Sequence, residues 1–143
     1  MKIKITLITF LIILLINIIS CKKNNDNSKT KTELLTSKTW VYDEYFEGYN
    51  SSNTILYYKR GKSSNLINFG IDRVTFKSDG TYSEINETGE TLNGTWALLN
   101  GESQLQVINT TGTYISTIVV LNNDNYYWYD PSRANGIFAK MVH

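Results

Sequence analysis

The chain has 143 residues, with 14 Lys and Arg against 13 Asp and Glu, a formal net charge of +1 and 13% aromatic residues. This balance excludes a whole-molecule field that would draw the protein to nucleic acid or to anionic lipid. Cys21 is the only cysteine. An intramolecular disulfide is therefore excluded, and burial of apolar and aromatic side chains must hold the fold together.

The N-terminal stretch has the pattern of a secretory signal peptide. Lys2 and Lys4 form a short basic region, and residues 5–19 are almost entirely aliphatic. The aliphatic run is shorter than the about 20 residues that a transmembrane helix needs. The sequence therefore favours removal of residues 1–20 over a retained membrane span.

The apolar run ends at Ile18-Ile19-Ser20-Cys21. This tetrapeptide resembles the lipobox of bacterial lipoproteins. The resemblance implies cleavage before Cys21, acylation of that cysteine and retention in the cell envelope, because two or more acyl chains hold a protein stably on a membrane. Lys22 follows, where aspartate would favour the inner membrane in some bacteria, so we expect the outer membrane and leave the leaflet open. The alternative is a secreted protein with a free thiol at Cys21.

The next segment, residues 21–32, is strongly polar after the cysteine. Lys22 to Thr32 contains no apolar residue, so this segment cannot offset the entropy of becoming ordered, and we expect a flexible lipidated tether. Residues 33–143 suit one compact domain. Thr30 and Glu33 have the spacing of a capping box, which predicts one or two helical turns that end near Ser37.

From Trp40 onward the pattern changes to a period of two, with β-branched and aromatic residues bounded by turn residues. Asp79-Gly80 and Asn100-Gly101 are typical of tight hairpins. Hairpin connections and the need to avoid exposed edges favour an all-β, antiparallel up-and-down barrel of about eight strands over a sandwich. The candidate strands are Trp40–Phe46, Thr54–Lys59, Arg73–Lys77, Thr81–Asn86, Gly94–Leu99, Gln104–Asn109, Tyr114–Leu121, Tyr126–Tyr129 and Gly136–Met141.

Four stretches in this order resemble the lipocalin-like domains of small bacterial lipoproteins: residues 35–40, which end at Trp40, the hairpin of residues 74–82, Gly94-Thr95-Trp96 and residues 126–129. The resemblance implies a barrel of about eight antiparallel strands. Lys38 stands where the lipocalin opening motif has a glycine, so the ligand binding of true lipocalins is not carried over.

The residues offer little for catalysis or metal binding. The only histidine, His143, is the last residue, so Ser/His/Asp chemistry has no internal base, and acylation would occupy Cys21. Asp43 with Glu47, or Glu84 with its neighbours Glu87 and Glu90, could form a weak calcium site or a carboxylate pair, but solvated carboxylates are the better interpretation. We expect a protein that is not an enzyme and needs no cofactor or metal.

A long irregular segment, residues 60–71, follows the second candidate strand. Lys59, Arg60 and Lys62 lie beside tyrosines, a combination that can bind single-stranded nucleic acid, but the neutral total charge favours a solvated turn and no nucleic-acid partner. The apolar half of the segment either caps a barrel mouth or tucks Leu66 and Phe69 into the core.

In residues 126–129 both faces of the strand carry rings, and the sequence leaves open which face is internal. Our sharper hypothesis is that Tyr82, Trp96, Tyr127 and Tyr129 line a cavity for a small apolar or sugar-like ligand. The alternatives are a filled core and an interaction module that docks an envelope protein. The sequence thus predicts a lipid-anchored, non-catalytic binding protein of the bacterial envelope.

Overall fold

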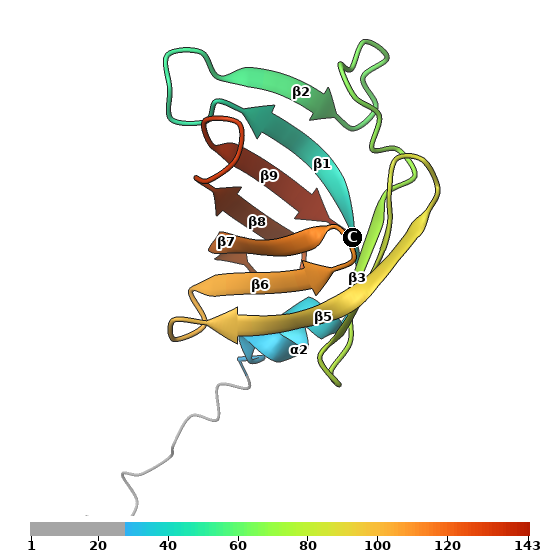
Figure 1. Cartoon of the computed structure of the whole chain (residues 1–143), viewed down its shortest axis with the longest axis vertical. Coiled ribbons are helices and arrows are strands. Elements are labelled where there is room, and N and C mark those ends of the chain that lie inside the picture. Colours follow the sequence, from blue (N-terminus) through green and yellow to red (C-terminus); the bar gives the residue numbers. More distant parts are fainter. Residues whose placement is uncertain (1–27) are drawn as a thin grey trace, which may run out of the picture.

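The computed structural model describes residues 28–143, which form a short helix and nine antiparallel strands (Figure 1). The elements are α2 (Lys31–Thr36), β1 (Thr39–Glu47), β2 (Ile55–Lys59), β3 (Arg73–Phe76), β4 (Thr81–Ile85), β5 (Thr91–Leu99), β6 (Gln104–Asn109), β7 (Gly112–Leu121), β8 (Asn125–Asp130) and β9 (Ile137–Val142). All nine predicted strands are confirmed within a few residues of their predicted ends.

Eight of the strands close into a barrel. Each strand from β3 to β8 pairs with the next one along the chain, and β9 pairs back onto β1. The seam between β1 and β3 is short, with the pairs Thr39↔Thr75 and Trp40↔Val74. Further along β1, strand β2 takes the place of β3 on the same edge. The predicted all-β, up-and-down barrel is confirmed. Strand β2 extends the sheet past the β1–β3 seam that closes the barrel.

The hairpin turns follow the residues that the sequence supplies. Gly80 has φ +83° and Gly101 has φ +62°, which glycine adopts without the steric penalty that a Cβ atom would add. Asp79 accepts hydrogen bonds from both the backbone N–H and the hydroxyl of Thr81, and these bonds fix the β3–β4 turn. The pairing between strands is thereby set locally at each hairpin.

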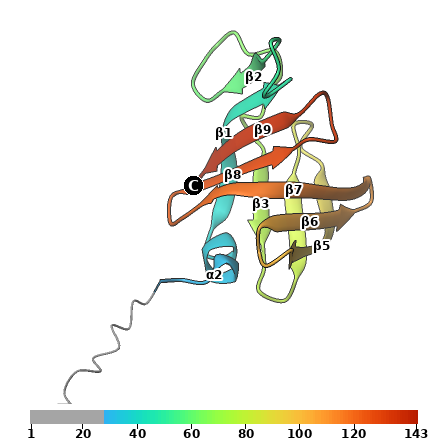
Figure 2. The same cartoon turned by 90° about the vertical axis from the view of Figure 1, so that its left-hand side faces the viewer.

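Helix α2 closes one end of the barrel. The predicted capping box is present, because Thr30 accepts from the Glu33 N–H and the Glu33 carboxylate accepts from the Thr30 N–H. Leu35, on the inner face of the helix, is fully buried with Trp40 in the main core cluster. Figures 1 and 2 show α2 below the barrel and β2 at the far end.

The main core fills the half of the barrel nearest α2. Apart from Leu35 and Trp40, it consists of side chains from β3, β4, β5, β6, β8 and β9, with several aromatic rings in edge contacts. These members are Val74, Phe76, Tyr82, Trp96, Leu105, Tyr126 and Met141. Aromatic rings in edge contact fill space well and gain favourable electrostatics beyond the area that they bury.

A second core cluster lies between β1, β9 and the β2–β3 loop. Phe69, from the loop, stacks on Tyr42 with ring centroids 4.4 Å apart and contacts Tyr45 and Tyr58. The expectation that Phe69 packs into the core is confirmed. The expectation for Leu66 was wrong, since its side chain is 67% exposed; the loop turns its backbone N–H toward the Tyr57 carbonyl instead.

The outer faces of β8 and β9 are covered by the protein's own β1–β2 turn. Tyr49, in that turn, stacks on Phe138 with centroids 4.3 Å apart and packs against Tyr129. Tyr127 lies against the edge of Phe138 on the same outer face. Both faces of β8 can carry rings because one faces the core and the other has this covering turn.

Within residues 28–143, no helix is both long enough and apolar enough to cross a bilayer.

Candidate functional site

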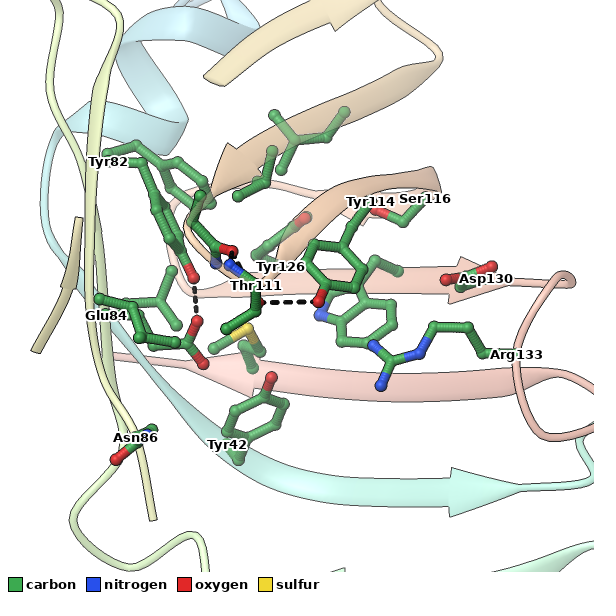
Figure 3. Close-up of a pocket in the computed structure, with 18 of the residues that line it drawn as sticks. Tyr42, Tyr82, Glu84, Asn86, Thr111, Tyr114, Ser116, Tyr126, Asp130 and Arg133 are labelled. Carbon is green, nitrogen blue, oxygen red and sulfur yellow. Dashed lines mark hydrogen bonds between the residues drawn. The ribbon is translucent and has the colours of Figure 1, made fainter. Parts of the chain in front are cut away.

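The barrel contains a cavity of about 380 Å³ at the end away from α2. Its walls come from all eight barrel strands and from the β4–β5, β6–β7 and β8–β9 turns, which reach it through Glu87, Thr111 and Arg133. The volume is in the range of small-molecule sites, about 300 to 1,000 Å³. Figure 3 shows hydroxyl, carboxylate and guanidinium groups among the aromatic and aliphatic side chains of this cavity.

On the β4 wall, two side chains form a pair. Tyr82 and Glu84 are two residues apart on one strand, so both face the cavity, and the Tyr82 hydroxyl donates a hydrogen bond to the Glu84 carboxylate (Figure 3). Burial raises the pKa of Glu84; the Tyr82 hydrogen bond opposes this shift, and the charge of Glu87 adds to it. The cavity therefore holds an acceptor whose charge is poorly solvated.

Across the cavity, the β8–β9 turn contributes a cation. Arg133 lies with its Cζ atom 5.2 Å from the centroid of the Tyr114 ring, within the range of a cation–π contact. The turn itself is held by Asp130, which is buried and accepts from the Ser132 N–H at 2.8 Å and the Ser132 hydroxyl at 2.6 Å. Arg133 is thus presented by a turn with fixed backbone geometry.

These two charges face the cavity without an ionic partner. In the part of the chain that the structure describes, the ion pairs join Glu44 to Lys59 and Lys140 and join Asp124 to His143. Neither Glu84 nor Arg133 is among them. A charged group that is partly buried gains most from a partner or a hydrogen bond, so these two groups can still form strong bonds to a molecule in the cavity.

Tyrosine hydroxyls supply neutral polar groups to the same space. The Tyr114 and Thr111 hydroxyls are hydrogen-bonded at 2.8 Å, and the Tyr42 hydroxyl points into the cavity from the β1 side (Figure 3). Burial raises the pKa of both Tyr42 and Tyr126, so these phenols stay protonated and can donate hydrogen bonds. The walls therefore offer both donors and acceptors next to aromatic rings.

The structure corrects the predicted cavity residues. Tyr82 lines the cavity, as predicted. Trp96 does not; it is buried in the core, where its Nε1–H donates to the Lys77 carbonyl at 2.9 Å. Tyr127 and Tyr129 do not line it either, because they lie on the outer face of β8.

Tyr126 and Trp128 occupy the inner face of β8 in their place. Alternation along the strand allowed either arrangement, and the pairing of β8 with its neighbours selected this one. Sequence reasoning also missed Glu84 and Arg133 as cavity residues. The available signal for Glu84 was its spacing of two from Tyr82 on one predicted strand.

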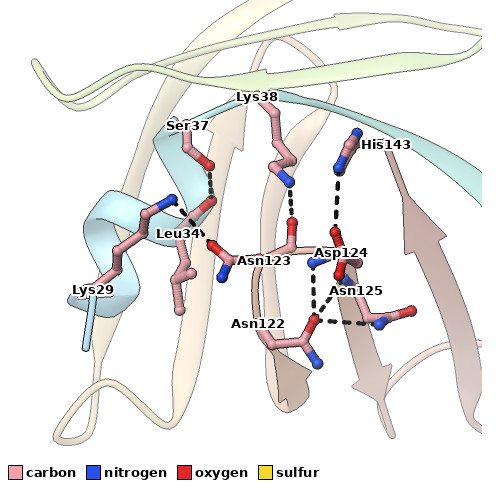
Figure 4. Close-up of polar contacts among 9 residues, drawn as sticks. All are labelled: Lys29, Leu34, Ser37, Lys38, Asn122, Asn123, Asp124, Asn125 and His143. Carbon is pink, nitrogen blue, oxygen red and sulfur yellow. Dashed lines mark hydrogen bonds and ion pairs between the residues drawn. The ribbon is translucent and has the colours of Figure 1, made fainter. Parts of the chain in front are cut away.

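The remaining predicted groups lie elsewhere. His143 contacts Asp124 at 3.5 Å near α2, where Lys29 donates to the Asn123 side chain at 3.0 Å (Figure 4). This end is opposite the cavity mouth. Over residues 28–143, no three His, Cys, Asp or Glu side chains are grouped so that they could hold a metal ion. Ile18-Ile19-Ser20-Cys21 lies outside the described residues.

No protein-family model matches the chain, and no curated protein matches it by sequence. Solved structures do resemble the fold. A DUF4847 family protein from Bacteroides vulgatus has a TM-score of 0.58 at 15% identity, over 80% of this chain and 97% of its own. At this identity the likeness extends to the fold alone.

Two further structures resemble the chain less closely. A lipocalin-like protein from Bacteroides uniformis has a TM-score of 0.46 at 11% identity, over 73% of this chain and 94% of its own. An uncharacterized protein from Bacteroides eggerthii has a TM-score of 0.45 at 9% identity, over 73% and 97%.

Proposed function

We propose that this protein is a lipid-anchored, non-catalytic binding protein of the bacterial cell envelope, and that its barrel cavity takes a small polar ligand. The observation that supports binding is the cavity of about 380 Å³ with Glu84 and Arg133 unpaired on its walls. Pockets that bind small molecules combine apolar walls with a few converging polar groups. The lipobox-like residues before and at Cys21 support the anchor.

Between the two ligand types that the sequence suggests, the wall chemistry favours the sugar-like one. A purely apolar ligand would desolvate both groups and leave the Glu84 carboxylate with the Tyr82 hydroxyl alone as a donor and the Arg133 guanidinium without an acceptor, which is unfavourable. A hydroxyl-rich ligand can donate to Glu84, accept from Arg133 and place its less polar face on Trp128 or Tyr114. Aromatic rings next to hydrogen-bonding groups suit such a molecule.

Native mass spectrometry tests this proposal directly. The full-length protein would be purified from its own membranes in a mild neutral detergent, together with the variant Glu84→Gln and the matched control Glu102→Gln, whose side chain lies at the opposite end, in the β5–β6 turn. We expect a bound polar small molecule on the wild type and on the control, with at least about tenfold weaker binding to Glu84→Gln. If the wild type carries no small molecule and binds none of a panel of monosaccharides, the proposal is wrong.

The anchor has a separate test. In cells that express Cys21→Ala, we expect the protein to leave the membrane fraction, because a mature domain without acyl chains has no stable anchor. Retention of this variant in the membrane fraction would contradict lipid anchoring. The same fractionation, with separated inner and outer membranes, tests the proposed outer-membrane location of the wild type.

The second candidate function, docking of an envelope protein, has less support from the surface. The aromatic side chains that the sequence offered for docking on β8 are packed against Tyr49 and Phe138 of the protein itself. A stoichiometric protein partner in a pull-down, without a small molecule, would favour this candidate over ligand binding.

A further inference from the structure

A second hollow lies outside the barrel closure, between β1, β2 and the β2–β3 loop. Its volume is about 320 Å³. The basic residues that line it are Arg60 and Lys62, at the start of the loop, and Arg73, at the start of β3. We refer to this hollow as the basic groove. The chain between Lys62 and Arg73 folds back on itself to bring these cations around one space.

The walls of the basic groove carry positive charge only. Its other side chains that carry polar groups are Asn65, Asn68, Tyr42 and Tyr58, of which Tyr42 directs its hydroxyl into the barrel cavity, and no Asp or Glu is on the groove lining. The carboxyl of Asp72 lies near Arg73 but is buried and does not line the groove. A concave surface lined by one sign of charge concentrates the field and attracts ions of the opposite sign.

Lys59, next to the groove, has an ionic partner, which the groove cations lack. Lys59 is paired with Glu44, which also binds Lys140, and these contacts lower the pKa of Glu44. Among residues 28–143, Arg60, Lys62 and Arg73 belong to no ion pair. The basic cluster that the sequence analysis interpreted as a solvated turn therefore has two parts. Lys59 forms an ion pair within the fold, and Arg60 and Lys62 do not.

Both arginines are held by the backbone. The Nε atom of Arg60 donates to the Tyr42 carbonyl at 3.3 Å, and Nη1 of Arg73 donates to the carbonyls of Gly70 at 3.3 Å and Asp72 at 2.7 Å. Each guanidinium has five N–H donors, so most of them remain for another acceptor. Orientation by the backbone reduces the side-chain entropy that binding would cost.

The loop that carries the groove is itself fixed. The Asn65 amide donates to the Lys59 and Lys62 carbonyls at 3.0 and 2.9 Å and accepts from the Lys59 N–H at 2.9 Å. Phe69 anchors the other half of the loop by stacking on Tyr42. The groove therefore has a preformed wall, and the cations stand on a loop tied at both halves.

We propose that the basic groove is a binding site for an oxyanion, specifically a phosphate group, with Arg60 and Arg73 as its hydrogen-bond donors and Lys62 as an additional charge. Planar guanidinium groups match phosphate oxygens in paired hydrogen bonds. Tyr58 and Phe69, on the groove wall, offer a ring surface for the remainder of a phosphorylated molecule. The site shares Tyr42 alone with the lining of the barrel cavity and does not depend on the function proposed for that cavity.

Two sources could provide the phosphate, a free small molecule or a phospholipid headgroup. Strand β2, beside the groove, lies at the end of the barrel opposite α2 (Figure 1). Both sources present the same phosphate chemistry to the groove, and separate titrations with inorganic phosphate and with a phospholipid distinguish them.

NMR titration of the ¹⁵N-labelled full chain in neutral detergent micelles tests the site. One arm adds inorganic phosphate against sodium chloride of equal ionic strength, and a second arm adds phosphatidylglycerol to the micelles. We expect saturable shifts of the Gly61 and Gly70 amides with phosphate, weakened at least about tenfold in Arg60→Gln and in Arg73→Gln. Lys77→Gln, which removes one exposed positive charge outside the groove, should bind like the wild type.

Every outcome decides the proposal. Saturable binding of free phosphate that both groove variants weaken supports it with a soluble ligand. Binding to phosphatidylglycerol alone, again weakened in the groove variants, supports the phosphate site with a headgroup as its source. If chloride gives the same shifts, if neither arm gives saturation, or if Lys77→Gln weakens binding as much as Arg73→Gln does, the proposal is wrong.

Discussion

The indole Nε1–H of Trp40 donates a hydrogen bond to the backbone carbonyl of Leu35 at 3.0 Å, and both residues are fully buried. The bond satisfies one of the carbonyls that the end of α2 leaves without a helical partner. It also fixes the position of the helix over the barrel end, because Trp40 begins the inner face of β1. The closed end of the barrel therefore depends on a residue pair that spans helix and strand.

This relationship predicts that α2 is part of the folding unit. Leu35→Ala should lower the free energy of unfolding by about 2–5 kcal/mol, since it removes a fully buried side chain from the core. The same substitution at the exposed Leu66 should change it by less than about 0.5 kcal/mol. Urea unfolding of both variants provides the measurement. Equal midpoints would mean that the helix adds nothing to barrel stability.

A second prediction concerns the approach of β5 to β6. A Cβ atom on Gly94 would lie 1.9 Å from the carbonyl oxygen of Ile108, so Gly94→Ala must push the two strands apart. We expect a loss of about 3 kcal/mol or more in the free energy of unfolding. Gly61→Ala serves as the control: φ there is +77° but no atom lies within 4 Å, so only about 1 kcal/mol of backbone strain is expected. Thermal unfolding would separate the two effects.

A third prediction follows from the buried carboxyl of Asp72. Its Oδ1 atom has no hydrogen-bond partner among the described residues, and burial, with the charges of Glu87 and Glu84, raises its pKa to about 7. The unfolded chain has the usual aspartate pKa of about 3.9. Between about pH 4 and pH 7 the unfolded state has therefore lost a proton that the folded state keeps, so this group makes stability fall as pH rises through that window.

Asp72→Asn removes this titration. We expect the variant to gain stability relative to the wild type between about pH 4 and pH 7, by at least about 1 kcal/mol, and the gain to stay constant above that range. Urea unfolding at intervals of one pH unit measures it. Asp79→Asn, on an exposed turn whose hydrogen bonds from Thr81 lower the carboxyl pKa, should show no such gain. A difference between Asp72→Asn and wild type that does not vary with pH would contradict the assignment.

A fourth prediction tests the electrostatics of the cavity. The Tyr82 hydroxyl donates to Glu84 and so opposes the rise in the Glu84 pKa that burial causes. Tyr82→Phe should raise that pKa further, because it removes the hydrogen bond that favours the charged carboxylate. The Glu84 carboxyl carbon, followed by NMR against pH, reports it. Tyr127→Phe is the matched control, because the Tyr127 hydroxyl donates to Asn125 on the outer face, and it should leave the Glu84 titration unchanged.

Much of the architecture could be predicted because its signals are local. The capping box at Thr30 and Glu33 placed α2, and alternating residues bounded by Asp79-Gly80 and similar turns placed the strands. These features depend on residues that are close together in the sequence, so the sequence alone is enough to predict them. The closed barrel followed from hairpins between consecutive strands, and the structure confirms it.

The candidate site was harder to predict because the side of a strand that faces the interior depends on how the strand pairs with its neighbours. A strand with rings on both faces, such as β8, can turn either set inward, and Tyr127 and Tyr129 were assigned to the wrong face. Glu84 was considered with the other acidic residues of its hairpin as a solvated carboxylate, yet it lies on the cavity wall. The groups that surround Glu84 are distant in the sequence, and no local sequence pattern predicts them.

The sequence by itself determined where strands, turns and helix begin and end, because backbone propensity, alternation and capping act over a few residues. Only the tertiary structure decided which side of each strand became the interior. Closure of β9 onto β1 and the pairing of β8 fix that choice together, since a shift of one residue would exchange every inner and outer side chain. Glu84 and Arg133 face one cavity because the barrel closes, and Arg60 and Arg73 share one groove because the β2–β3 loop folds back against β1.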